Sequence, residues 1–345
     1  MSRTLHLEAS APGDLQRAAS LLREGRLVAF ATETVYGLGA NAFSPDAVAA
    51  IFAAKQRPSW DPLIVHLAFA EELSSVAHIP AELAGRIAAL ANAFWPGPLT
   101  LLLPRDAVIP DAVTAGRELV GVRVPAHPAA HALLAAVGLP IAAPSANLFG
   151  HTSPTTAAHV LADLDGRIDA VLDAGPTSIG LESTVLDPTQ TPMVLYRPGA
   201  VTVAQLTTAT GVAVKVFTPD TVAQHDHPAS MPSPGVGIRH YAPRARLVLV
   251  DGSAAALQAA LHETGSDASV VSLGALLPEG WLLEGDVILQ PWSRWEDPEG
   301  LAATLFSGLH ALDDCGVSLI LCPLPEPGGI ADAIRDRLQK AARTT

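Results

Sequence analysis

The spacing of apolar and polar residues follows two alternating patterns along the chain. From Asp14 to Glu24, apolar residues recur every three or four positions, which predicts an amphipathic helix that ends at Gly25. Short apolar runs, such as Leu27–Ala31 and Leu99–Leu103, lie between helical segments and predict buried strands. Because strands and helices follow one another along most of the chain, we expect an α/β fold.

A predicted hairpin changes the expected type of sheet. The residues from Asp187 to Gln190 are typical of a turn, and they join strands predicted at Gly180–Leu186 and Met193–Tyr196. Antiparallel neighbours combined with helices indicate a mixed sheet and not a wholly parallel one. We therefore predict a large, twisted mixed sheet in the first part of the chain.

The pattern changes at Gly211, which predicts a domain boundary. A segment rich in His, Pro and Asp extends to Ser233 and is typical of a linker. Strands and helices then alternate again, at Arg246–Val250, Ala254–His262, Ser269–Leu273, Asp286–Leu289, Leu301–Asp313, Val317–Leu321 and Ile330–Arg343. We predict a large domain at 1–210, a linker at 211–243 and a smaller, Rossmann-like α/β domain at 244–345.

The composition limits the class of protein. The chain has 345 residues, of which 49% are hydrophobic, so it can bury more than one core. No apolar run is long enough to cross a bilayer and the amino terminus does not resemble a signal peptide, so we expect a cytoplasmic protein without membrane contact. Cys315 and Cys322 match neither a disulfide framework nor a metal motif. The net charge of −13 disfavours stable nucleic-acid binding, although a local basic groove stays compatible with it.

One helix carries a charge where its apolar stripe predicts a core residue. Ser44 is typical of an N-cap, and the helix that follows places Lys55 on the same face as Val48. Arg57 lies just beyond the helix end, so two cations are close together. A lysine is a compact point charge that suits a phosphate, and we therefore predict an anion site. A lysine that extends into solvent from a helix end is the alternative.

Two further polar residues occupy predicted strands. His66 lies in the strand Leu63–Leu67, where it is either a hydrogen-bonded core histidine or a pocket donor. Arg123 follows Gly121 on an otherwise apolar strand, which fits either a closely approaching carboxylate or phosphate or an internal salt bridge. Neither residue alone distinguishes between its two interpretations.

Small and hydroxyl-bearing residues end another predicted strand, which begins at Pro140 and finishes in Ser145-Ala-Asn147. Ser153-Pro then resembles a helix start. A helix amino terminus is a common phosphate site, but simple capping needs the same residues. The sequence has no Walker A loop, because it contains no Gly-Lys dipeptide. The stretch Gly37–Ala42 lacks the helix start and the acidic residue of a dinucleotide site.

Motifs along the chain together resemble the Sua5/YrdC/YciO family. Those of the YrdC domain are Thr32-Glu-Thr-Val-Tyr-Gly, Lys55-Gln-Arg-Pro, Ser145-Ala-Asn, Glu182-Ser-Thr-Val and Arg197-Pro-Gly. Pro234-Gly and Arg239-His-Tyr-Ala-Pro resemble the linker of the longer, Sua5-type form, so the resemblance covers nearly the full length. It implies a YrdC-like catalytic domain and a linker that closes over the active site. It also implies threonylcarbamoyl-AMP synthase activity, in which L-threonine, bicarbonate and ATP give L-threonylcarbamoyladenylate and pyrophosphate for the t6A modification of adenosine 37 in tRNA.

The resemblance also implies roles for single residues. Lys55 and Arg57 would be catalytic and bind the triphosphate, and ATP would also contact Asp61, Ser145, Asn147, Ser153, Arg197, His240 and Tyr241. L-Threonine would contact Thr34, His66, Arg123, Ala143 and Ser183. Mg²⁺ would enter with ATP, bound through its phosphates, and no direct metal ligand is expected. The product would pass to TsaD-type transfer machinery that acts on tRNA.

Three departures from the family pattern bear on these roles. Asp61 replaces a common Asn and places an anion near the expected phosphates, Leu119 occupies a position that is often polar, and Val236-Gly-Ile replaces the usual linker residues. Two rival functions remain. One is a carbamoyl-adenylating module like that of hydrogenase maturation proteins. The other is a double-stranded RNA-binding or ribosome-assembly factor with a YrdC-like fold, which would need a basic concave surface.

Overall fold

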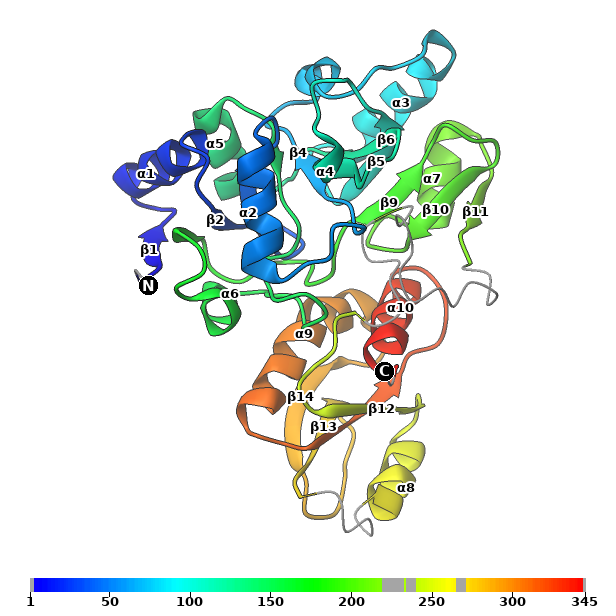
Figure 1. Ribbon diagram of the computed structural model, residues 1–345. Helices are drawn as coiled ribbons and strands as arrows, with labels where there is room; N and C mark the ends of the chain where they lie inside the picture. Colours follow the sequence, from blue (N-terminus) through cyan, green and yellow to red (C-terminus); the bar gives the residue numbers. More distant parts are fainter. Residues whose placement is uncertain (1–2, 219–232, 234–239, 265–270, 344–345) are drawn as a thin grey trace. The chain divides into compact units, whose positions relative to one another are not determined.

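The computed structural model describes residues 3–218, 233, 240–264 and 271–343, which form two compact units (Figure 1). The first unit holds the described residues up to 233, except the loops Gly150–Ser153 and Ile179–Leu181. Those two loops belong with residues 240–343 in the second unit. The domain limits at 210 and 243 stay a prediction. Much of the expected linker, including Arg239 and residues 236–238, lies outside the described residues.

The first unit is built on a mixed sheet, which confirms the prediction from the hairpin pattern (Figure 1). Among the described residues, its strand order is β1-β8-β2-β3-β7-β4-β6-β5-β9-β10-β11. Strand β2 pairs antiparallel with β3, β4 pairs parallel with β6, and β9 pairs antiparallel with β10. The strands are β1 (Leu5–Glu8), β2 (Val28–Ala31), β3 (Tyr36–Asn41), β4 (Ile64–His66), β5 (Leu99–Pro104), β6 (Leu119–Arg123), β7 (Ile141–Ala142), β8 (Ala170–Asp173), β9 (Thr184–Asp187), β10 (Met193–Arg197) and β11 (Val214–Val216).

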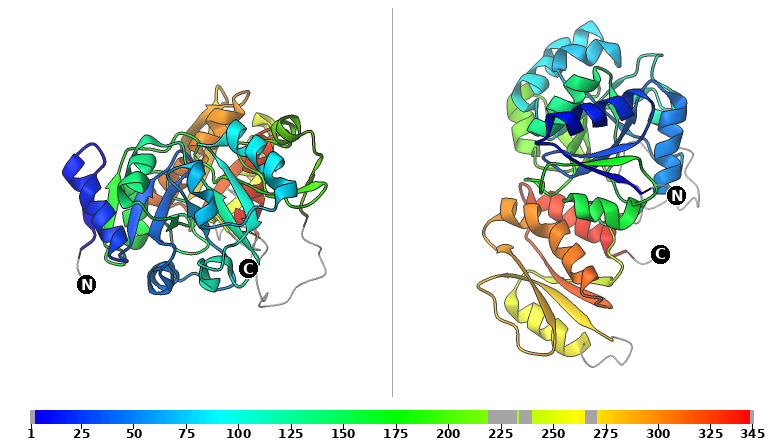
Figure 2. Two further views of the ribbon diagram at one scale, coloured as in Figure 1. Left: turned by 90° about the horizontal axis from the view of Figure 1, so that it is seen from above. Right: turned by 90° about the vertical axis from the view of Figure 1, so that its left-hand side faces the viewer.

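Helices cover both faces of this sheet. On one face, α1 and α5 lie side by side and bury Leu22 and Leu134 (Figures 1 and 2). On the other face, α2 and α3 contribute Ile51 and Leu90 to a separate, larger core. None of the helices in the described residues is long and apolar enough to cross a membrane. The helices are α1 (Pro12–Arg23), α2 (Pro45–Lys55), the 3₁₀ helix η1 (Ala70–Ser75), α3 (Ala81–Phe94), α4 (Asp111–Thr114), α5 (Pro128–Val137), α6 (Ala157–Leu164) and α7 (Val203–Thr210).

The second unit is a smaller α/β domain, as the sequence predicted. Its sheet has the order β12-β15-β13-β14, and all described strand pairs in it are parallel. Leu257 of α8 packs against Leu321 of β15 in its core. Its elements are β12 (Arg246–Asp251), α8 (Ala254–Thr264), β13 (Leu273–Glu279), β14 (Ile288–Arg294), α9 (Pro298–Asp314), β15 (Leu319–Leu324) and α10 (Ala331–Ala341).

Two glycines lie inside strands where an added side chain would clash. Gly39 belongs to β3, where an added Cβ would lie 2.9 Å from a ring carbon of Phe30. The strand predicted to end at Leu273 begins there instead. Gly274 continues it, and an added Cβ would lie 2.9 Å from a methyl carbon of Leu312. Both glycines permit close packing inside a strand and do not end it.

The helix predicted to start at Ser153 begins later. Thr156 is the N-cap of α6, and its hydroxyl accepts a hydrogen bond from the backbone N–H of His159 at 3.3 Å. Ser153 therefore does not cap a helix. Two strand starts are also later than predicted, since β9 begins at Thr184 and β14 at Ile288.

Candidate functional site

The helix α2 carries Lys55 into the protein interior, as its apolar stripe predicted. Ser44 caps the helix and Pro45 is its first residue. Lys55 is the last helical residue, and only 1% of its surface is exposed, so the alternative of a solvent-facing lysine is wrong. Gln56 adopts the left-handed conformation with φ of 53° and ends the helix.

The Lys55 ammonium organises the turn that follows β7. Its Nζ donates a hydrogen bond to the carbonyl oxygen of Ser145 at 2.6 Å and another to the carbonyl oxygen of Asn147. Burial and the nearby charge of Arg57 lower the pKa of Lys55 well below its usual value. The ammonium has three N–H groups, so these two bonds do not use all its donors.

Arg57 lies beside this turn and is already paired with an acid. Its Nη2 is 3.0 Å from Oδ2 of Asp61, and both side chains are buried. Arg57 also donates to the carbonyl oxygens of Asp61 and Pro62 at 3.1 and 2.8 Å, and its guanidinium carbon lies 6.0 Å from the ring centre of Phe149. Phe149 follows the turn from Ser145 to Asn147, and its N–H donates a hydrogen bond to the Lys55 carbonyl oxygen. The turn therefore lies beside Lys55, Arg57 and Asp61.

The residues predicted to bind threonine gather on neighbouring strands. His66 of β4 is the register partner of Arg123 on β6, and Ala143 follows β7, which pairs with β4 on its other side. Arg123 Nη1 donates to the Thr34 hydroxyl at 2.9 Å, and its Nε donates to the Gly97 carbonyl at 3.1 Å. These contacts hold the buried guanidinium in one orientation.

Glu33 adds a buried acid that the sequence analysis did not include in the site. Its Oε1 lies 2.7 Å from Nη2 of Arg123. Burial alone would raise the pKa of the Glu33 carboxyl, but the positive charge of the adjacent Arg123 guanidinium holds that pKa below its usual value. Glu33 is therefore ionised at neutral pH. The available signal was a lone acid between two threonines in the loop that joins two buried strands.

His66 is held as a neutral side chain next to Arg123. Its Nδ1 lies 3.2 Å from the carbonyl oxygen of Ile64, and because a carbonyl only accepts, this contact assigns the proton to Nδ1. Burial and the charge of Arg123 lower the pKa of His66 from 6.5 to about 3. Its ring also meets the ring of Phe30 edge-on at 6.3 Å.

Ser183 and Arg197 contact each other directly. Arg197 donates from Nε to the Ser183 carbonyl at 3.0 Å and from Nη2 to its hydroxyl at 3.1 Å. The Ser183 hydroxyl also lies 2.8 Å from the hydroxyl of Thr100, a second residue that the sequence analysis did not name. From the sequence we expected Ser183 to bind threonine and Arg197 to bind the nucleotide, and this contact joins the two residues in one polar group.

Three predicted nucleotide contacts, Ser153, His240 and Tyr241, belong to the second unit. All three are buried. The Ser153 carbonyl oxygen lies 3.1 Å from Nε2 of His310, which donates to it.

Two contacts hold the Tyr241 ring within the second unit, one with an aromatic ring and one with a cation. Its ring stacks on Phe306 of α9 at 5.9 Å, and the guanidinium of Arg337 from α10 lies 5.1 Å from its ring centre. Its backbone has a positive φ of 66°, which is uncommon for an aromatic residue. Its carbonyl accepts from the hydroxyl of Thr152 at 3.3 Å.

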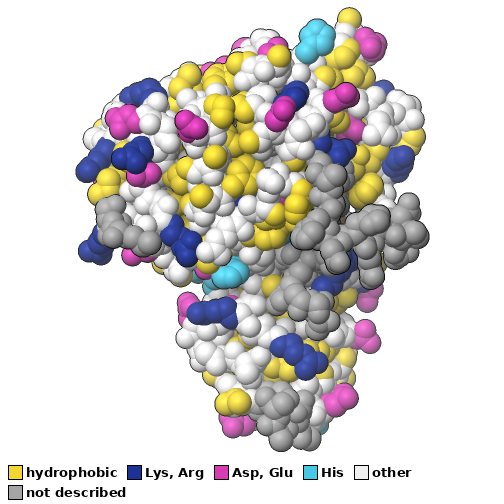
Figure 3. Space-filling model, in the orientation of Figure 1, with side chains coloured by type: hydrophobic (Ala, Val, Ile, Leu, Met, Phe, Trp, Pro, Cys, Tyr) yellow, Lys and Arg dark blue, Asp and Glu magenta, His cyan; other side chains and the backbone are white. Residues whose placement is uncertain are grey.

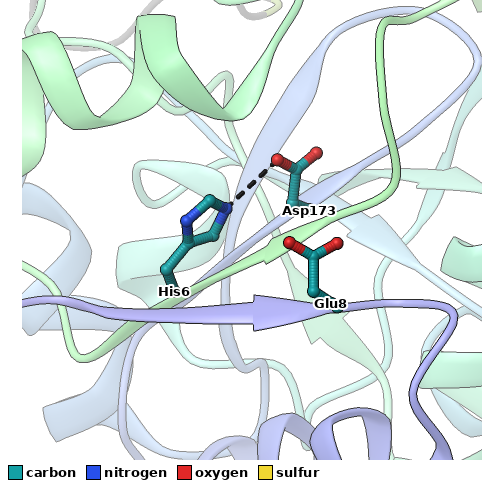
Figure 4. Close-up of side chains that lie close together, drawn as sticks. All are labelled: His6, Glu8 and Asp173. Carbon is teal, nitrogen blue, oxygen red and sulfur yellow. Dashed lines mark hydrogen bonds and ion pairs between the residues drawn. The ribbon is translucent and has the colours of Figure 1, made fainter.

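No set of three metal ligands lies around Lys55 among the described residues. The one such group among the described residues is His6, Glu8 and Asp173, on the paired strands β1 and β8 (Figure 4). In it, His6 Nε2 contacts Asp173 Oδ2 at 3.1 Å. Beside Lys55, the Asp61 carboxylate is ion-paired with Arg57. Because this carboxylate is already ion-paired, the surroundings of Lys55 suit a magnesium ion bound through nucleotide phosphates better than one bound by protein carboxylates.

Two family models match consecutive parts of the chain and together cover most of it. The model of the Sua5/YciO/YrdC family, described as telomere recombination, matches residues 20–199. The model described as the threonylcarbamoyl-AMP synthase C-terminal domain matches residues 201–343.

Relatives of similar length carry the same description. The chain is 40% identical over 340 residues to threonylcarbamoyl-AMP synthase of Pyrococcus abyssi, covering 94% of this chain and 93% of that protein. It is 43% identical over 331 residues to threonylcarbamoyl-AMP synthase of Bacillus subtilis, covering 95% and 92%. A crystal structure of P. abyssi Sua5 complexed with L-threonine has a TM-score of 0.85 to this structure at 38% identity, covering 99% and 98% of the two chains.

Proposed function

The chain belongs to the Sua5 family of threonylcarbamoyl-AMP synthases, and we propose on this basis that the residues around Lys55 bind its nucleotide. The chain forms L-threonylcarbamoyladenylate and pyrophosphate from L-threonine, bicarbonate and ATP, for the t6A modification of tRNA. The buried ammonium of Lys55, against the turn from Ser145 to Asn147, is the observation that supports the nucleotide assignment most strongly.

The reaction requires stabilisation of negative charge more than covalent catalysis. The threonine amine loses a proton and is carboxylated by bicarbonate, with release of water. A carbamate oxygen then bonds to the α-phosphorus as the bond from that phosphorus to the pyrophosphate oxygen breaks. Charge grows on the leaving pyrophosphate, so fixed cations beside it contribute most to the rate. Lys55 and Arg57 are our candidates for these cations.

Lys55 has two roles in this proposal. Its bonds to the carbonyl oxygens of Ser145 and Asn147 shape the turn, and its remaining N–H would donate to a phosphate oxygen. A phosphate anion beside the ammonium would also favour its protonated form, against the effect of burial. We assign Arg197 and the polar groups of Ser145 and Asn147 to the same nucleotide site, together with Asp61, which lies there as the counter-ion of Arg57.

The threonine site is assigned to a different group of residues. Arg123 would bind the substrate carboxylate, and Thr34, His66, Ala143 and Ser183 would surround the rest of the amino acid. This assignment is supported by the contacts that hold Arg123 and by the bond between Ser183 and Arg197, since that bond joins a threonine contact to a nucleotide contact. Adjacent sites are what an in-line transfer between the two substrates needs.

The second domain and its linker complete the proposal. We assign residues 1–210 to the catalytic domain, 211–243 to a linker that closes over the active site, and 244–345 to the C-terminal domain. Ser153, His240 and Tyr241 would contact the nucleotide when the linker is closed. Closure would keep water from the mixed anhydride of the product, which hydrolyses readily. If so, truncation before Ser233 shortens the lifetime of the bound product, whereas an equal lifetime with and without the linker would contradict this role.

Mg²⁺ and the downstream partner are further parts of the proposal. Mg²⁺ would enter bound to the ATP phosphates and would supply positive charge for the leaving pyrophosphate, and we assign no protein ligand to it. We place the reaction in the cytoplasm, where ATP and tRNA are available, and expect the product to pass to TsaD-type transfer machinery.

The rival RNA-binding function has little support on the visible surface. Figure 3 shows scattered Lys and Arg side chains among Asp and Glu side chains, without a continuous basic track among the described residues of that face. The formal charge of −13 also opposes binding to a polyanion.

The proposal is tested with the purified chain, ATP, Mg²⁺, bicarbonate and single amino acids. Pyrophosphate release should require both bicarbonate and threonine, and the carbamoyl adenylate of threonine should appear in equal amount. Release that is independent of threonine, or salt-sensitive RNA binding without pyrophosphate release, would contradict it.

A further inference from the structure

The Glu33 carboxylate has hydrogen-bonding capacity that the protein does not use. The side chain is buried, with 6% of its surface exposed. Its Oε1 lies 2.7 Å from Nη2 of Arg123, yet among the described residues none gives either carboxylate oxygen a well-aligned hydrogen bond. The attraction between the charges of Glu33 and Arg123 depends on distance and is therefore present, but both carboxylate oxygens can still accept hydrogen bonds. A buried acceptor without a donor is costly, so its retention calls for a specific explanation.

Arg123 also has N–H groups that no well-aligned hydrogen bond uses. Its Nε and Nη1 donate to Gly97 and Thr34, while Nη2 makes the charge contact with Glu33 but no well-aligned hydrogen bond. A guanidinium held in this way can still receive a carboxylate through its free N–H groups. The pair therefore offers donors on Arg123 and acceptors on Glu33 within a few ångströms of each other.

A fixed chain of hydroxyl groups adds one more acceptor. Thr32 donates its proton to the Val35 carbonyl at 2.6 Å, so the 2.8 Å contact between the two threonine hydroxyls must have Thr34 as donor. Thr34 in turn accepts from Arg123 at 2.9 Å. With its proton committed, the Thr34 oxygen can offer a ligand only a lone pair.

These groups match the two charged ends of a free amino acid. We propose that Glu33 binds the α-ammonium group of threonine while Arg123 binds its carboxylate, which makes Glu33 the residue that selects an amino acid over the corresponding hydroxy acid. This inference rests on the assignment of Arg123 to the threonine site. The ammonium would supply the donors that Glu33 lacks, and the ion pair would fix both groups before the substrate arrives.

The charge of Glu33 provides a test that distinguishes binding of the ammonium group from a purely structural role. In the unchanged protein, a ligand with a carboxylate but no ammonium adds a negative charge beside Glu33, which opposes its binding. Replacing Glu33 by Gln keeps the size of the side chain and removes its charge. Arg123 then attracts any carboxylate more strongly, whereas an ammonium loses its counter-ion. The variant should therefore weaken the binding of threonine without weakening the binding of the hydroxy acid.

The experiment measures binding of two ligands by calorimetry to the full-length chain and to Glu33→Gln. The ligands are L-threonine and 2,3-dihydroxybutanoate, in which a hydroxyl replaces the ammonium. We expect the Kd of threonine to rise roughly 10- to 100-fold, the scale of one hydrogen bond to a charged group. The Kd of the hydroxy acid should stay equal or fall. Glu33→Asp, which keeps the charge, should recover part of the preference for threonine.

The control is Glu71→Gln, because Glu71 is exposed. It should leave both Kd values unchanged. Equal weakening of both ligands in folded Glu33→Gln, or no change in either, would overturn the proposal. If the unchanged protein does not bind threonine at all, the threonine site itself is wrongly assigned.

Discussion

The ammonium of Lys55 lies 2.6 Å from the carbonyl oxygen of Ser145, a residue 90 positions further along the chain. This contact joins the end of α2 to the turn after β7. A charge on a helix face that should be apolar is thereby explained: it is buried because it hydrogen-bonds backbone that no strand or helix satisfies. The turn and the lysine form one structural unit, so a change in either should affect both.

Asp61 limits the charge that Arg57 can offer a phosphate, and its removal is the first prediction. In Asp61→Asn, the Arg57 bonds to two carbonyl groups remain, but its counter-ion is lost. We expect the KM for ATP to fall several-fold and stability to fall by about 3–5 kcal/mol, because the pair is buried and Arg57 loses its counter-ion. Steady-state kinetics and urea unfolding measure these effects.

Asp111→Asn is the matched control for Asp61→Asn. Asp111 also contacts an arginine, Arg105 at 2.5 Å, but its side chain is 78% exposed. Surface ion pairs contribute little, so neither KM nor stability should change appreciably. An unchanged or higher KM for ATP in Asp61→Asn would show that this carboxylate does not compete with the nucleotide.

His66 should make the protein sensitive to acid. The pKa of His66 is about 3 in the folded protein and 6.5 in the unfolded chain, so between these values the unfolded chain binds the extra proton. Stability is therefore complete above pH 6.5 and is lost as the pH falls toward 3. At pH 5 the expected loss from this group is about 2 kcal/mol relative to pH 7.5.

Urea unfolding at pH 7.5 and pH 5 measures this effect, and His66→Gln should reduce the difference between the two pH values. His78→Gln, at an exposed position, should not. Identical pH dependence in all three proteins would show that His66 is not the buried neutral group.

Much of the fold follows from local pattern, but contacts between distant residues do not. Periodicity predicted α2 and placed Lys55 on its buried face, and a turn motif predicted the mixed sheet. Nothing local indicated that Lys55 meets Ser145, since such a contact depends on how β7 is placed in the sheet. Glu33 was missed for the same reason, because its partner Arg123 lies on another strand and became visible only in three dimensions.

Positions with two valid local interpretations produced the errors. Ser153 followed by Pro resembles a helix start. Thr156 is the N-cap instead, because its hydroxyl accepts a hydrogen bond from the backbone N–H of His159. Gly274 resembles a strand end, although tight packing against Leu312 requires it inside β13. Sequence pattern identifies the residue type that a site needs, whereas tertiary packing decides which of two such sites is used.

The Tyr241 ring should stabilise the second domain. It lies between Phe306 and the guanidinium of Arg337, and its surface is 1% exposed. Tyr241→Ala leaves a cavity and removes the partner of a buried cation, so we expect a loss of about 3–5 kcal/mol. Tyr241→Phe keeps the ring and should retain most of that stability. Thermal unfolding of both variants measures the difference, and equal melting temperatures would contradict the importance of the ring.

The nucleotide assignment depends most directly on the charge of Lys55. Lys55→Met keeps much of the apolar stem but removes the ammonium, and Lys215→Met removes an exposed lysine on β11 as a control. Pyrophosphate release driven by threonine and bicarbonate is the decisive measurement. We predict that Lys55→Met loses activity roughly 100- to 1,000-fold, as expected for a group that stabilises transition-state charge, while Lys215→Met retains it. A folded Lys55→Met protein that releases pyrophosphate at the unchanged rate would contradict the account.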